Sequence, residues 1–406
     1  MTAISEEAIV GFASDLIAIP TENPPGAAYE QCIERISAEL EVLSIDYELV
    51  DTGERDAPRR AILATVGDGG PLLYLHGHYD VVPAFSGAQF EPRVERGHLV
   101  GRGASDMKGG LAAIVHAARP AAEAGARIGL VIVPDEESGG RLGAERLAAL
   151  GRLDSHAAGA IVAEPTWGTI WHASRGAFTV RVSVRGRPAH VGLHYEGVNA
   201  FAAGVDLALA LRGLERALRE RKSVLDFGSS DGRAGESIML VGGLAGGGTN
   251  FNIVPDEFSF TIDRRPNPDE HYDEAKQELL HALAGFTAEG VGIDWEVLQD
   301  APSAVTPPDG EFVRTVAAAV AAAAGTPPAV TCCPGVLEIR VYDRLGIPAV
   351  AFGPGLIDKM HAPDEDVPIA NLVAAATIYA EVGAALAAAG VGRRRPGRRC
   401  RPGWAG

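Results

Sequence analysis

The periodicity of apolar and polar positions differs between two regions of the chain. Over residues 61–175, and again near residue 350, short apolar runs are separated by alanine-rich stretches. Strands that alternate with helices in this way are typical of an α/β fold with a mostly parallel sheet. We expect strands at 61–66, 72–75, 128–133, 160–163 and 349–352, and helices at 108–124, 142–150, 310–324 and 370–389.

Between residues 176 and 298 the rhythm changes. "AFTVRVSVRG" alternates like a half-exposed strand and is followed by an amphipathic helix, two strands, a second helix and a last strand. The order β-α-β-β-α-β predicts a ferredoxin-like α+β domain. We therefore expect a sheet domain of 1–175 and 299–390, an inserted domain of 176–298, and a basic tail of 391–406.

Length and charge narrow the class of protein. With 406 residues, two domains are expected rather than one. The net charge of −17 disfavours nucleic acid and anionic membranes as partners. The N-terminus carries acids where a signal peptide needs bases, and no uncharged apolar run has the ~18 residues of a membrane span. We expect a cytoplasmic protein with reduced cysteines and a disordered, solvated tail.

Polar clusters follow the predicted strands. His78 and Asp80 follow one strand, Glu136 and Glu137 the next, and Glu164 another, while His361 lies beyond the last. Open α/β sheets gather their ligands at the carboxyl ends of strands, so we expect these side chains at one crevice. The two histidines together with three carboxylates, Asp106, Glu137 and Glu164, suit a pair of divalent metal ions, with Zn²⁺ first and Co²⁺ or Mn²⁺ as alternatives.

Each of these residues has a plainer interpretation when it is taken alone. Asp106 precedes a predicted helix and suits an N-cap. Glu136 and Glu137 suit a solvated acidic loop, and His361 suits an ordinary surface or core histidine. The ordered combination favours the metal site over these alternatives.

Seven fragments occur in the order found in one enzyme family. They are "HGHYDVVP", "GRGASDMKGG", "PDEESGG", "AEPT", "GRPAHVG", "DRRPNP" and "FGPG". On these motifs the chain resembles the M20 family of metal-dependent amidohydrolases, which includes acetylornithine deacetylase, succinyl-diaminopimelate desuccinylase and glutamate carboxypeptidase. The match extends over almost the whole chain.

The resemblance implies a role for each residue of the cluster. Asp106 would bridge two metals, with His78 and Glu164 completing one site and Glu137 and His361 the other. Glu136 would be the general base. Asp80 would hydrogen-bond the His78 imidazole and fix its tautomer, while His76 is interpreted as a structural strand-end histidine.

The resemblance also implies residues that contact the substrate. His190 would stabilise the oxyanion, either in its own subunit or across a dimer. Arg265 would bind a substrate carboxylate, with Arg264 as an equally basic neighbour. Asn252 and Gly353 resemble other substrate-lining positions. At "PGVLEIR" the chain departs from the family pattern, and we hypothesise that Arg340 there adds a second cationic contact.

These observations predict a cytoplasmic metal-dependent amidohydrolase that removes an acyl group from an N-acylated amino acid or a related small amide. A metal-bridging water would attack the amide, with Glu136 as the base. A dipeptidase or carboxypeptidase of the same scaffold is the first alternative, and a binding protein without activity is the second. No nucleophile elbow of the G-x-S-x-G type is present for a serine hydrolase. The resemblance implies that the domain of 1–175 and 299–390 is catalytic, and that the inserted domain of 176–298 is a lid or dimerisation domain through which a homodimer forms.

Overall fold

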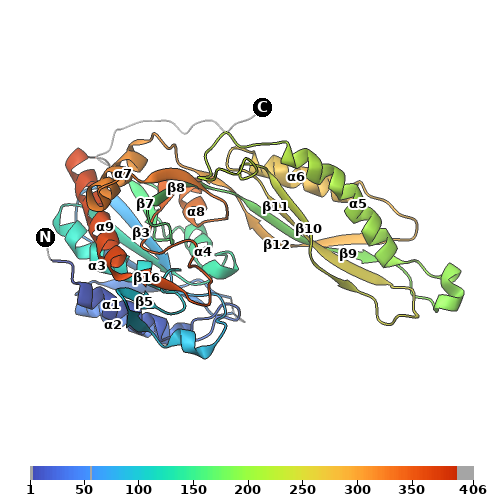
Figure 1. Cartoon of the computed structure of the whole chain (residues 1–406), viewed down its shortest axis with the longest axis horizontal. Coiled ribbons are helices and arrows are strands. Elements are labelled where there is room, and N and C mark those ends of the chain that lie inside the picture. The colour runs from blue at the N-terminus through green and yellow to red at the C-terminus, as the bar shows by residue number, and fades with distance from the viewer. Residues whose placement is uncertain (1–2, 55–56, 391–406) are drawn as a thin grey trace. The chain divides into compact units, whose positions relative to one another are not determined.

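The computed structural model describes residues 3–54 and 57–390 of the chain, so the predicted tail lies outside the described residues. These residues form two compact units (Figure 1). Unit 1 is drawn from Met1–Gly168, Asp309–Pro328 and Leu345–Gly406, and unit 2 consists of Thr169–Pro308 and Ala329–Arg344. The domain bounds that we expected from the sequence remain a prediction.

Unit 1 is built on a mixed sheet. Its strands lie in the order β1 (Tyr47–Asp51), β2 (Arg60–Val66), β6 (Arg127–Val133), β3 (Leu72–His78), β7 (Gly159–Val162) and β15 (Ala349–Ala351). The pairs β6–β3, β3–β7 and β7–β15 are parallel, whereas β1–β2 and β2–β6 are antiparallel. The α/β prediction is confirmed, but the sheet is parallel only from β6 to β15. At its other end β1 and β2, which are joined by a short connection, pair antiparallel, and so do β2 and β6.

The central strands are buried along their whole length. Every residue of β3 is buried, as are all but the first of β6. Parallel strands covered on both faces consist of continuous apolar runs, which is the pattern that the sequence shows there. His78 is the last residue of β3, so a buried, paired strand fixes the main chain at the first predicted ligand.

Helices cover this sheet, and a small second sheet lies beside it. The helices of unit 1 are α1 (Glu6–Ile17), α2 (Tyr29–Val42), α3 (Lys108–Glu123), α4 (Ala144–Ala149), α7 (Glu311–Ala324) and α9 (Ile369–Ala389). The second sheet has the order β16 (Asp366–Pro368), β5 (His98–Val100) and β4 (Arg93–Glu95). Gly110 permits α3 to approach β7, because a Cβ there would lie 2.4 Å from the Ala163 carbonyl oxygen.

Among the described residues, one helix has the length and composition of a membrane span. It is α9, and half of its most apolar window is buried within the protein. Leu372, Ile378 and Val382 are fully buried, and α9 packs against α3 and α7. These contacts are those of a core helix.

Unit 2 contains the predicted ferredoxin-like unit. Its elements are β9 (Ala177–Arg185), α5 (Ala200–Arg219), β10 (Ile238–Gly247), β11 (Glu257–Arg265), α6 (Tyr272–Ala284) and β12 (Gly292–Ala301). The four strands form an antiparallel sheet of order β10-β11-β9-β12, and α5 and α6 cover one face of it (Figure 1). The predicted β-α-β-β-α-β order is confirmed.

Four short elements complete unit 2. They are β8 (Thr169–Ser174), β13 (Ala304–Val305), β14 (Ala329–Cys333) and α8 (Ile339–Arg344). β8 pairs antiparallel with β13 and parallel with β14. They were not predicted from the sequence, because Thr169, His172 and Ser174 interrupt the apolar run of β8, and β13 has only two residues.

Candidate metal centre

His78 presents one ring nitrogen to a carboxylate and the other to the main chain. Its Nδ1 lies 3.0 Å from the backbone oxygen of Asp80, so an N–H at Nδ1 donates there. In the neutral imidazole the Nε2 atom then carries the lone pair, and it lies 3.3 Å from Asp106 Oδ1. Both of these facing atoms are buried and make no hydrogen bond. Two acceptors in this arrangement fit a cation between them.

Asp106 lies in a turn that a buried glutamate holds. Glu365 Oε1 accepts hydrogen bonds of 3.0 Å from the backbone N–H groups of Ser105 and Asp106, and its Oε2 accepts one of 2.6 Å from Arg102. Met107, not Asp106, is the N-cap residue of α3. The N-cap interpretation of Asp106 is therefore wrong, and its 4 % exposed side chain has no helix-capping role.

Glu164 follows β7 and is 5 % exposed. The turn after β15 packs against the backbone here. A Cβ at Gly353 would lie 2.3 Å from the Ala163 carbonyl oxygen and 2.5 Å from that of Glu164. The Gly353 N–H donates to Thr166 Oγ1 at 3.2 Å. Gly353 thus permits the close approach of two ligand-bearing loops, while its predicted contact with substrate stays a prediction.

Glu137 and His361 meet Asp106 from the other side. His361 Nε2 lies 3.2 Å from Asp106 Oδ2 and 3.4 Å from Glu137 Oε2. The other oxygen of Glu137 accepts the Val82 N–H at 3.2 Å. The Glu137 side chain is only 6 % exposed, so the solvated-loop interpretation does not hold for it.

The predicted ligands form two overlapping groups. Ligand atoms of His78, Asp106 and Glu164 lie within 4.8 Å of one another, and so do those of Asp106, Glu137 and His361. Asp106 belongs to both groups through its two oxygens. The structure therefore brings together all five side chains named from the sequence and gives Asp106 the position of a shared carboxylate.

The electrostatics of this cluster favour positive charge. Burial lowers the pKa of the His78 imidazole, but the carboxylates of Asp106 and Asp80 outweigh it and raise this pKa well above the usual range. Asp106 and Glu137 raise the pKa of His361 to about 10. Burial and the charge of Asp106 raise the pKa of Glu137. A divalent cation would relieve the repulsion between these carboxylates.

Asp80 organises the turn that carries Glu136. Its Oδ1 accepts the Glu136 N–H at 3.2 Å, and its Oδ2 accepts the Glu137 N–H at 3.1 Å. The distance from Oδ1 to His78 Nδ1 is 3.5 Å, longer than that from the Asp80 backbone oxygen. The predicted role of the Asp80 carboxylate in fixing the tautomer stays a prediction, while its bonds to the turn are an additional role that the structure shows.

Comparison with known proteins agrees with this geometry. The model of peptidase family M20/M25/M40 matches residues 74–384, which contain every residue of the cluster. The chain belongs to this family. A Mycobacterium tuberculosis protein, provisionally named succinyl-diaminopimelate desuccinylase, is 31 % identical over 375 residues, covering 90 % of this chain and 95 % of that protein.

Solved structures share the M20 fold. A Staphylococcus aureus tripeptidase superposes with a TM-score of 0.74 at 21 % identity, covering 95 % of this chain and 99 % of that one. A Bacillus subtilis M20 peptidase described as dinuclear and metal-binding superposes with a TM-score of 0.67 at 16 % identity, covering 94 % and 98 %. At these identities the likeness shows the fold alone.

The remaining predicted residues of this M20 protein lie in unit 2. His190 and Asn252 are neighbours there, because the Val191 N–H donates to the Asn252 carbonyl at 2.9 Å and His190 bridges to Ile253. Arg340 is 1 % exposed at the start of α8. Their predicted contacts with substrate stay predictions.

Arg264 and Arg265 differ in environment. Arg264 is 1 % exposed and donates to Ser237 and Glu270. Arg265 is partly exposed and donates through Nε to Asp263. Strand alternation points the two side chains to opposite faces of β11. The predicted contact of Arg265 with a substrate carboxylate stays a prediction.

Two residues of the site were not named from the sequence. Glu365 holds the Asp106 turn, and Asn23 donates at 2.9 Å to Asp80 Oδ2. In the sequence, Glu365 could have been identified only by its place four residues after His361, and Asn23 only by its place in "PTENPPG". Neither residue belongs to a periodic pattern of apolar positions.

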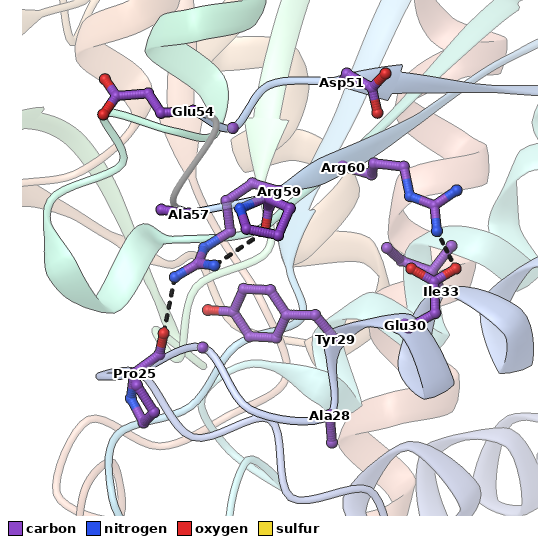
Figure 2. Close-up of a pocket in the computed structure, with 13 residues that line it drawn as sticks. Pro25, Ala28, Tyr29, Glu30, Ile33, Asp51, Glu54, Ala57, Arg59 and Arg60 are labelled. Atoms are coloured by element: carbon purple, nitrogen blue, oxygen red, sulfur yellow. Dashed lines mark hydrogen bonds and ion pairs between the residues drawn. The ribbon is translucent and has the colours of Figure 1, made fainter.

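A cavity of about 800 Å³ lies in unit 1, and none of the five clustered ligands lines it. In Figure 2 the Arg59 guanidinium faces the Tyr29 ring, with 4.8 Å between the guanidinium carbon and the ring centroid. Arg59 donates to the Pro25 carbonyl at 2.9 Å, and Arg60 pairs with Glu30. Arg59 Nε also lies 3.6 Å from Asp135 Oδ1, next to the Glu136 turn.

Proposed function

We propose that this M20 protein is a dinuclear metal-dependent amidohydrolase that removes the acyl group from an N-acylated amino acid or a related small amide. The observation that carries the proposal is the position of Asp106, which belongs to two groups of three potential ligands. A carboxylate with one oxygen directed to each group is suited to bridging two cations.

The donor set fits two divalent ions. His78, Asp106 and Glu164 would hold one ion, and Asp106, Glu137 and His361 the other. Imidazole and carboxylate donors suit Zn²⁺ first, with Co²⁺ or Mn²⁺ as substitutes. When bound, the pair supplies Lewis acidity, which activates water and polarises the amide carbonyl.

Glu136 is the proposed general base. It belongs to neither ligand group, yet its backbone N–H is bonded to Asp80 in the same turn as Glu137. Its carboxylate takes a proton from the attacking water and delivers it to the departing amine nitrogen. His190 donates to the developing oxyanion.

Recognition of the substrate is assigned to unit 2. Arg265 has a planar fork that matches a carboxylate, and its partial exposure leaves part of that fork open. Asn252 is the proposed amide contact, and the proximity of its main chain to that of His190 supports this role. Arg340 is the proposed second cationic contact, and Gly353 lines the site in unit 1.

A deacylase and a peptidase differ in which side of the hydrolysed amide bond carries the amino acid. The M. tuberculosis relative with desuccinylase in its name supports the deacylase, because the alignment covers 95 % of that protein. The S. aureus tripeptidase structure keeps a dipeptidase or carboxypeptidase as the alternative. Both would use the same ligands and the same base.

We further propose a homodimer through unit 2. β10 is an edge strand with exposed Leu240 and Leu244, and the neighbouring α5 exposes Phe201 and Leu209. An apolar edge strand beside an apolar helix face is a surface suited to pairing with a second copy. We also propose a cytoplasmic location, as expected from the sequence.

A substrate panel tests the proposal. Purified protein loaded with Zn²⁺, Co²⁺ or Mn²⁺ is assayed against N-acetyl, N-succinyl and N-formyl amino acids and against dipeptides. We expect metal-dependent release of a free amine from at least one N-acyl amino acid. Turnover of dipeptides alone favours the peptidase, and a protein that binds no metal and hydrolyses none of these favours the binding protein.

A further inference from the structure

Asn23 lies behind the Glu136 turn, outside both ligand groups. It is 3 % exposed, in the segment between α1 and α2. Its Nδ2 atom lies 2.9 Å from Asp80 Oδ2, 2.9 Å from Ser138 Oγ and 3.3 Å from Asp135 Oδ1. One amide group therefore contacts the carboxylate that binds the turn and also both ends of the turn itself.

The main chain fixes Asn23 in this place. Its N–H donates to the Val81 carbonyl at 2.8 Å, and the Val81 N–H donates to the Thr21 carbonyl at 3.0 Å. The Thr21 hydroxyl also donates to the Tyr79 carbonyl. The segment thus runs as a short extra strand beside residues 79–81, which follow His78.

Charge explains why an amide suits this position. Asp80 and Asp135 are 0 % and 6 % exposed, so two carboxylates are buried close to the same group. Arg59 approaches Asp135 from the side of the cavity in Figure 2, at 3.6 Å. A neutral amide donates to both carboxylates without a further charge, whereas a third carboxylate there would repel them.

Asp135 depends on its side-chain bonds. Its φ of 72° lies in the left-handed region, which is unfavourable for a residue with a Cβ. Its Oδ2 accepts the Leu142 N–H at 3.2 Å, and its Oδ1 accepts the Ser138 hydroxyl at 3.0 Å. These bonds and the Asn23 amide hold the start of the Glu136 turn.

We propose that Asn23 is a positioning residue for Glu136. It acts through Asp80 and Asp135 on the main chain of the turn and does not touch the substrate. The inference rests on the proposed function for the identity of the base. The geometry of the turn can be measured independently of turnover.

Asn23→Ala tests the proposal in the full-length protein loaded with Zn²⁺. We expect kcat to fall about 10- to 100-fold, as for other residues that orient catalytic groups, with KM and the metal content unchanged. Hydrogen exchange of peptides covering residues 134–140 should accelerate, because the N–H groups of Glu136 and Glu137 lose a firmly held acceptor. Asn199→Ala is the control, since Asn199 only caps α5 in unit 2 and should change neither quantity.

Exchanging the amide of Asn23 and the carboxylate of Asp135 distinguishes a specific role of Asn23 from general destabilisation of the protein. Asn23→Asp alone places three carboxylates together and should lower kcat further than Asn23→Ala. The double variant Asn23→Asp/Asp135→Asn restores one amide and two carboxylates, so it should recover part of kcat and of the slow exchange. If Asn23→Ala does not fold, the comparison of Asn23→Asp with the double variant tests the proposal by itself.

The inference is overturned if Asn23→Ala keeps wild-type kcat and exchange, or if the double variant is no better than Asn23→Asp. A wild-type protein without any amidase activity would refute the proposed function instead. In that case, faster exchange over residues 134–140 in Asn23→Ala would still support the positioning of the turn.

Discussion

The two units of this protein position their polar side chains by different means. In unit 1, His78, Glu137 and Glu164 lie at or after the ends of buried central strands, and every residue of β3 is buried. In unit 2 the four-stranded sheet has one face covered by α5 and α6, and its edge strand β10 is largely exposed. Buried, paired strands therefore hold these side chains in unit 1, while the edge of the sheet in unit 2 remains exposed.

Because of this difference, we expect substitutions in the ligand cluster of unit 1 to have larger effects than substitutions on the exposed side of unit 2. Changes in the ligand cluster alter groups with little freedom to adjust, and leave buried charges unbalanced. Changes on the exposed side of unit 2 remove single contacts that water can replace. The predictions below test this order.

The largest effect should come from removing the shared carboxylate. Asp106→Asn leaves both groups with one carboxylate fewer, so we expect the loss of at least one equivalent of bound metal and of all measurable turnover. Metal content by mass spectrometry and the assay together check this. Chelation of the wild-type protein should give the same loss, and re-addition of Zn²⁺ should reverse it only in the wild type. Full metal content and activity in Asp106→Asn would contradict the bridging role.

Glu136→Gln should retain both metals and lose kcat by about 10²- to 10⁴-fold, the usual contribution of a general base. The amide side chain has the same size, so the turn bonded to Asp80 should persist. Steady-state kinetics with a metal determination check this prediction. Glu91→Gln, on an exposed residue that follows the 3₁₀ turn Gly87–Phe90, is the control. Retention of most kcat in Glu136→Gln would show that another group takes the proton.

Arg265→Ala should reduce kcat/KM by about 10- to 100-fold for a substrate with a free carboxylate, since a hydrogen bond to a charged group contributes about 1.5–3 kcal/mol. The effect should be much smaller for the corresponding amide. Arg185→Ala removes an exposed arginine of β9 that pairs with Asp294, and serves as the control. An equal loss for both substrates would assign Arg265 a structural role.

Leu240→Glu should have the smallest effect on the fold and a clear one on assembly. Leu240 is 55 % exposed on β10, so the change in unfolding free energy should stay within about 0.5 kcal/mol. A charge there should shift the sedimentation coefficient from dimer toward monomer. Val94→Glu, on an exposed strand residue of unit 1, should leave assembly unchanged. A wild-type monomer that is fully active would contradict the proposed dimer.

The sequence predicted the parts of the fold that have long apolar patterns. All five expected strands and all four expected helices of unit 1 are present. The strand expected at 72–75 extends to His78, because pairing with β6 and β7 continues after the apolar run has ended. The helices α1 and α2 were not predicted, since the alanine-rich pattern that marked the others is absent from them.

The sequence identified the proposed ligands of the candidate site, but not Asn23 and Glu365, which hold the neighbouring turns in place. His78, Glu137, Glu164 and His361 are chemically distinctive and come after predicted strands, whereas the role of Asp106 was implied by the resemblance to the M20 family. Asn23 and Glu365 lie in loops, and an asparagine or glutamate there has no periodic signature. Their contacts with Asp80 and with the Asp106 turn join residues 57 and 259 positions apart, which only the folded chain reveals.

The discontinuity of unit 1 has a consequence for biosynthesis. His78 leaves the ribosome well before His361, and the whole of residues 169–308 is translated between them. A nascent chain that has reached unit 2 can pair β3 with β6 and β7, yet it lacks β15, Glu365 and the second imidazole. Under the proposed function, both ligand groups are complete only after residue 361 has been translated, so a product that ends before this residue lacks one of the five proposed ligands.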